Sequence, residues 1–116
     1  MDTTDTKRRL RAAVTSQVEG ARRGLLLAGE HLKGESQQEV PHDEGTLEDT
    51  AKVTVSSDGL TVAVSYGTAY AVRQHEELDW NHQDGRKAKF LEDPLNREKD
   101  VMARLIQREV RTEMGT

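Results

Sequence analysis

The sequence contains no cysteine, so neither a disulfide framework nor a thiolate metal site can form. Aromatic residues account for only 3% of the chain and apolar residues for 34%, whereas charged residues reach 33%. This balance predicts a thin hydrophobic core under a very polar surface. A thin core favours completion against other subunits, because an obligate interface resembles a core divided between chains.

Long apolar runs are also missing. None approaches the roughly 20 residues that span a bilayer, and the N-terminal segment lacks the apolar centre of a signal peptide. We therefore expect a soluble protein without membrane partners that folds in the cytoplasm. The length of 116 residues suits a single domain over 1–116.

The net charge of −4 argues against a dedicated nucleic-acid-binding protein, which carries a basic excess on one face. A local basic cluster near the N-terminus is the exception: Lys7, Arg8, Arg9 and Arg11. Two interpretations stay open for it, a solvated helix face and a patch that binds phosphate or a partner.

Residues 1–33 have the spacing of one helix. Apolar residues recur every three or four positions and form one stripe: Leu10, Val14, Val18, Ala21, Leu25, Ala28 and Leu32. Thr4 or Asp5 can cap the start, and Gly34 suits the end. Three glycines either weaken the helix, by on the order of 1 kcal/mol each, or admit another backbone at close range: Gly20, Gly24 and Gly29.

Residues 34–50 are polar and predict a surface connector, in which Pro41 pushes Val40 toward extended geometry. The next stretch, KVTVSSDGLTVAVSY, alternates apolar and polar residues on both sides of Asp58-Gly59. Alternation with a period of two, interrupted by Asp-Gly, predicts a β-hairpin. The apolar positions are Val53, Val55, Leu60, Val62, Val64 and Tyr66.

We expect the sheet region to span 51–78, with a third strand or a helical turn after Gly67, and a loop to follow over 79–89. A second helix over 93–113 would open with Asp93 as its cap and Pro94 as its first residue. Its inward face would carry Leu95, Met102, Leu105, Ile106 and Val110. The predicted class is α+β, with a small antiparallel sheet packed by a long N-terminal and a C-terminal helix.

The stretch HEELDWNH, from His75 to His82, gathers polar groups with the only tryptophan. Its two histidines are not four residues apart, so with Glu76 and Asp84 they do not have the spacing of a helical zinc site. Paired carboxylates need a desolvated cleft, which a small core does not supply. Because no nucleophile elbow, phosphate loop or dinucleotide fingerprint occurs, we expect no enzyme activity and no cofactor.

Trp80 either closes the core or anchors a partner, since tryptophan is enriched at interface hot spots. Phe90 and Leu91 either form a hydrophobic staple before the last helix or join the same contact. The acidic run at 76–79 and the basic run at 86–89 can pair locally or head-to-tail between subunits. The second arrangement is heterologous and closes into a ring when the rotation permits.

Two motifs resemble the neck proteins of long-tailed bacteriophages, a family also described as tail-completion, head–tail joining or minor capsid proteins. VPHDEGTLEDTAKV (Val40–Val53) is similar to a signature of proline, glycine, leucine and a hydroxyl residue. A second signature resembles the segment Tyr66–Asn96, with Tyr70-Ala71, then His75-Glu76, and KFLEDPL before the last helix.

The resemblance covers about residues 35–112. It implies a virion protein of the head–tail junction, assembled in the host cytoplasm as a hexameric ring beside connector and tail tube proteins. Minor capsid proteins, transient assembly factors and small nucleic-acid-binding regulators stay open as alternatives. The expected contact residues are Tyr66, Tyr70, His75, Glu76, Trp80, Arg86, Lys87, Lys89, Phe90 and Leu91.

We expect Trp80→Ala to weaken assembly while the circular dichroism of the monomer stays nearly unchanged, because an anchor contributes to the contact and not to the fold. Melting of the monomer, followed by circular dichroism, is the companion measurement. A monomer that melts at a lower temperature would instead place Trp80 in the core.

Overall fold

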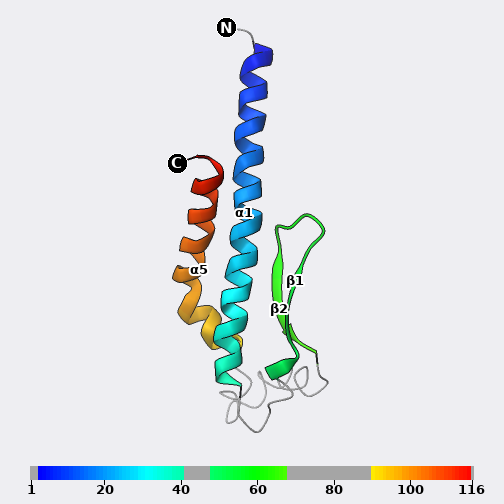
Figure 1. Cartoon of the computed structure of the whole chain (residues 1–116), viewed down its shortest axis with the longest axis vertical. Coiled ribbons are helices and arrows are strands. Elements are labelled where there is room, and N and C mark those ends of the chain that lie inside the picture. Colours follow the sequence, from blue (N-terminus) through cyan, green and yellow to red (C-terminus); the bar gives the residue numbers. More distant parts are fainter. Residues whose placement is uncertain (1–2, 41–47, 68–89, 116) are drawn as a thin grey trace.

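The computed structural model describes residues 3–40, 48–67 and 90–115. Its elements are α1 (Thr3–Glu39), β1 (Ala51–Val55), β2 (Val62–Tyr66) and α5 (Glu92–Glu113). Helix α1 is the central element, with α5 packed on one side and the hairpin on the other (Figure 1). The molecule is elongated, with extents of 65 × 24 × 23 Å. The predicted α+β class with a small antiparallel sheet is confirmed.

Helix α1 is longer than the sequence predicts. It begins at Thr3, so Thr4 and Asp5 lie in its first turn and do not cap it. It also continues through Gly34 to Glu39, which corrects the predicted connector over 34–50. Tertiary contacts explain the extension, because the last turn is held by a hydrogen bond between the hydroxyls of Ser36 and Tyr66 and by ion pairs to α5.

Two glycines bring the backbones of α1 and α5 together. A Cβ atom on Gly20 would lie 2.6 Å from the Cα of Val110, and one on Gly24 would lie 2.5 Å from the Cα of Ile106. No side chain fits at such distances, so the helices can pack this closely only with glycine at these two positions. Of the two interpretations of the three glycines, close approach of another backbone holds at these two, whereas a Cβ atom on Gly29 would meet the side chain of Val62 at 2.5 Å.

The hairpin pairs β1 with β2 in antiparallel register, with Ala51 opposite Tyr66. Its turn places Gly59 at φ 74°, a left-handed conformation that glycine adopts without strain. Asp58 supports the turn by accepting a hydrogen bond from the backbone N–H of Leu60 at 2.9 Å. The hairpin is confirmed, whereas the expected third strand or turn over 68–78 and the loop over 79–89 lie outside the described residues.

At the base of the molecule, Val40, Tyr66 and Phe90 form a buried apolar cluster. The two rings meet edge to face, with centroids 4.8 Å apart and planes at 88°. The hydroxyl of Tyr66 lies 2.7 Å from that of the buried Ser36, so the ring also has a polar tie to α1. Burial raises the pKa of Tyr66.

The cap and the first residue of helix α5 both lie two positions earlier than predicted. Leu91 is at its N-cap, so Asp93 and Pro94 both lie in the first turn, where a proline does not remove a helical hydrogen bond. Of the predicted inward face, Leu95 is 47% exposed, which corrects that assignment. The others are half-buried: Met102, Leu105, Ile106 and Val110.

We predict that Gly24→Ala destabilises the protein by about 1–3 kcal/mol, because the added methyl group overpacks the contact with Ile106. Gly34→Ala is the matched control, since a Cβ there meets nothing within 4 Å. It should stabilise the protein by about 0.4–1 kcal/mol, because alanine lowers the conformational entropy of the unfolded chain. Urea denaturation measures both, and equal effects from the two substitutions would contradict the packing described.

Candidate functional site

The first part of α1 extends past the end of α5 (Figure 1). We call residues 3–15 the projecting segment. Every residue in it is exposed except Asp5, which is half-buried. At 1.5 Å per residue it is about 20 Å long. A helix of this length is marginal in water on its own. The projecting segment is therefore supported by the packed part of α1 and offers its whole circumference to a partner.

The projecting segment carries apolar side chains without cover. Leu10 is 64% exposed and Val14 is 49% exposed. They are four residues apart and so lie on the same face of the helix. Both belong to the stripe predicted to face inward, and the structure corrects this because α5 ends before it reaches them.

The projecting segment is also basic. Lys7, Arg8 and Arg11 line a hollow of about 330 Å³. Arg9 lies apart from them in an ion pair with Asp5 at 3.1 Å. The tip of the molecule thus combines a positive surface with an exposed apolar pair.

A second surface lies toward the other end of α1. It is a groove of about 410 Å³ between α1, β2 and the beginning of α5. It is lined by Leu32, Val62, Ala63, Val64, Leu91, Glu92 and Leu95. The groove is therefore mostly apolar, with a carboxylate at its margin. The next residue in the chain, Asp93, is also acidic and exposed.

Ion pairs fix the helices that carry these two surfaces. Near the groove, Arg97 lies 3.3 Å from Glu39 and 3.4 Å from Glu35. Toward the projecting segment, Arg23 lies 2.8 Å from Glu113 and 3.3 Å from Glu109. Hydrogen bonds from Arg108 and Arg23 lower the pKa of Glu109. Both surfaces therefore lie on a pair of helices, α1 and α5, that are joined by ion pairs.

The predicted contact residues separate into two groups. Tyr66 and Phe90 are only 5% and 2% exposed, so they pack in the chain's own core and offer a partner almost no surface. This corrects their assignment as contact residues. Leu91 is half-buried and lines the groove. The rest lie outside the described residues: Tyr70, His75, Glu76, Trp80, Arg86, Lys87 and Lys89.

Sequence reasoning missed the one group of metal-ligating side chains that the described residues bring together, His31, Glu35 and Glu98. Its only signal in the sequence is the spacing of four between His31 and Glu35 on a predicted helix. The residues considered from the sequence, His75, Glu76, His82 and Asp84, lie outside the described residues.

Comparisons with models of protein families, with curated proteins and with solved structures give no significant match. Among the described residues, neither long helix contains an apolar stretch of the kind that crosses a membrane. The two surfaces and the motifs in the sequence are the features of this chain that bear on its function.

Proposed function

We propose that this protein is a structural component of the neck of a long-tailed bacteriophage, where copies of it form an oligomeric ring that joins or caps the tail. The sequence motifs at 40–53 and 66–96 suggest the family. The observation that carries the proposal is the presence of two different, complementary surfaces toward opposite ends of one elongated chain.

The two surfaces match in chemistry. The projecting segment offers Leu10 and Val14 with basic side chains nearby, and the groove offers apolar walls with the carboxylate of Glu92 in its lining. A contact between them is heterologous, since each copy gives one surface and receives the other. Heterologous contacts propagate and close into a ring when the rotation between neighbours permits.

The energy of this contact can be compared with the cost of association. Full burial of an apolar side chain contributes about 1.5–3 kcal/mol, and Leu10 and Val14 are 64% and 49% exposed before contact, so together they supply about 2–3 kcal/mol. Association costs about 4–15 kcal/mol in lost freedom of motion. One such contact on its own therefore falls short of the cost of association. Closure of the ring, or a connector that aligns the copies, supplies the remainder.

Three alternatives share parts of this evidence. A minor capsid protein or a transient assembly factor would use the same surfaces without forming a permanent ring. A small nucleic-acid-binding regulator would use the hollow lined by Lys7, Arg8 and Arg11. The net charge of −4 weighs against the regulator, and a DNA-binding assay at physiological salt should be negative.

Purified particles of the phage that encodes this chain should contain it at a fixed copy number in the neck. Quantitative mass spectrometry and a reconstruction with the symmetry of the tail measure this. A chain found during assembly but missing from finished particles would support the transient factor. A chain associated with the shell, away from the tail, would support the minor capsid protein.

The head-to-tail contact can be tested by cross-linking, because the chain has no cysteine of its own. A variant with both Arg11→Cys and Leu95→Cys should give a ladder of multimers when assembled particles are oxidised. Each single variant should stay uncross-linked, and a mixture of the two singles should stop at dimers. A dimer from either single variant would mean that like surfaces meet, which contradicts the heterologous contact.

A further inference from the structure

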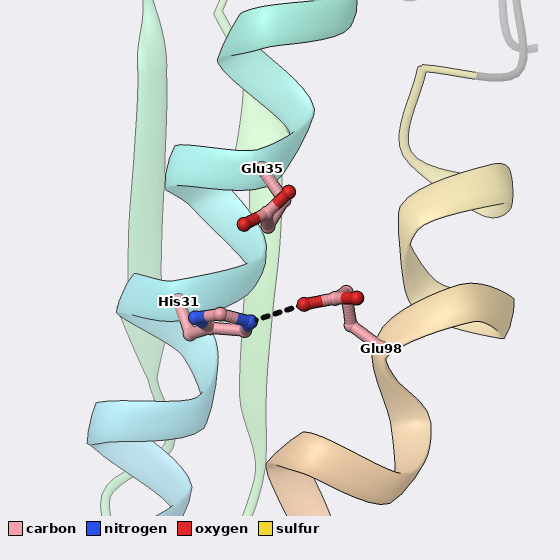
Figure 2. A group of neighbouring side chains, drawn as sticks. All are labelled: His31, Glu35 and Glu98. Atoms are coloured by element: carbon pink, nitrogen blue, oxygen red, sulfur yellow. Dashed lines mark hydrogen bonds and ion pairs between the residues drawn. The ribbon is translucent and has the colours of Figure 1, made fainter.

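His31, Glu35 and Glu98 converge midway along the packed part of α1 and α5. His31 and Glu35 are one helical turn apart on α1, and Glu98 reaches toward them from α5 (Figure 2). The Nε2 atom of His31 lies 2.6 Å from the Oε1 atom of Glu98. One ligand atom from each residue lies within 4.8 Å of the other two.

We infer that these three side chains form a binding site for a divalent transition-metal ion of the zinc type. A neutral imidazole and two carboxylates are the nitrogen and oxygen donors that such ions accept. Two carboxylates so close together also present the negative charge that a dication neutralises. The spacing of four places His31 and Glu35 on one face of α1, as helical metal sites require.

The geometry needs only small adjustments. Metal–ligand bonds of about 2.1 Å place the donor atoms of a tetrahedral site about 3.4 Å apart. The hydrogen bond between His31 and Glu98 would lengthen to that value, and Glu35 would swing inward. The glycine contacts hold the separation of the two helix backbones, so these adjustments would come from the side chains. Three protein ligands would leave a fourth position to water.

Arg97 is the group that competes with the metal. Its guanidinium lies 3.4 Å from Oε2 of Glu35 and 3.7 Å from Oε2 of Glu98, while it also pairs with Glu39 at 3.3 Å. A carboxylate has two oxygens, so Glu35 can keep Arg97 on one and ligate the metal with the other. The side chains are partly covered, with His31 29%, Glu35 29% and Glu98 18% exposed, so an ion can enter from solvent.

A metal here would join α1 to α5. The unfolded chain does not hold residues 31 and 98 together, so an ion that binds the folded state stabilises it by mass action. Binding would also fix the relative position of the projecting segment and the groove. The inference does not depend on the proposed function, because it concerns the isolated chain.

Titration of zinc chloride into the full-length protein, followed by calorimetry and by thermal melting, tests the site. We expect one zinc per chain and a higher melting temperature. Glu35→Gln removes one ligand and leaves the hydrogen bond between His31 and Glu98 in place. It should weaken binding by roughly tenfold or more, since even the loss of an outer-shell partner costs roughly 10–100-fold.

Two control variants test whether zinc binds at these three side chains and not elsewhere on the chain. Glu39→Gln removes a partner of Arg97 but no ligand, so it should lower zinc affinity much less than Glu35→Gln does. The double variant His75→Gln/His82→Gln removes the histidines of the other polar cluster and should also bind normally. Absence of zinc binding by the wild type would overturn the site. Equal losses from Glu35→Gln and Glu39→Gln, or loss in the histidine double variant, would overturn it as well.

Discussion

The close contact of the α1 and α5 backbones at Gly20 and Gly24 is the constraint on which the rest of the structure depends. It sets both the separation and the alignment of the two helices, because Val110 and Ile106 have to lie over glycines. With that alignment, α5 ends beside the middle of α1 and leaves residues 3–15 projecting. The same alignment brings Glu98 opposite His31.

Glycine packing also explains how a chain with so little apolar material stays folded. Among the described residues, the buried hydrophobic side chains are few: Ala28, Val40, Tyr66 and Phe90. Helices that meet through glycine gain dispersion contacts between backbones and need fewer large side chains between them. Ion pairs of Arg23 and Arg97 then fix the register of α5 along α1. In such a fold some apolar residues stay exposed at the surface, including Leu10 and Leu95.

Local patterns in the sequence were sufficient where the structure is decided locally. The alternation around Asp58-Gly59 predicted the hairpin, and helical spacing predicted both helices. The end of α1 was different. Gly34 is a common helix terminator, but contacts of Ser36 with Tyr66 and of Arg97 with Glu39 override that local preference. No single-sequence pattern contains those contacts, because their partners are distant in the chain.

The surfaces were harder to predict for the same reason. An apolar stripe shows which face of a helix can be buried, but not how far along the helix the partner extends. Leu10 and Val14 continue the stripe of Val18 and Ala28, and only the end of α5 distinguishes them. His31 and Glu98 likewise become neighbours only after the helices are aligned. Candidate sites that depend on one element could be read from the sequence, and those between elements required the fold.

The position of the His31–Glu98 contact would link the rigidity of the α1–α5 pair to the proposed assembly into a ring. It lies along α1 between the projecting segment and the beginning of α5, where the groove opens. Two different surfaces close a ring only if the angle between them is fixed, since a small angular error at each contact adds up around the circle. A helix pair held by glycine contacts, ion pairs and a bound cation has little freedom to vary that angle. Rigidity of the α1–α5 pair is therefore what would make a ring, and not an open chain, the product of a heterologous contact.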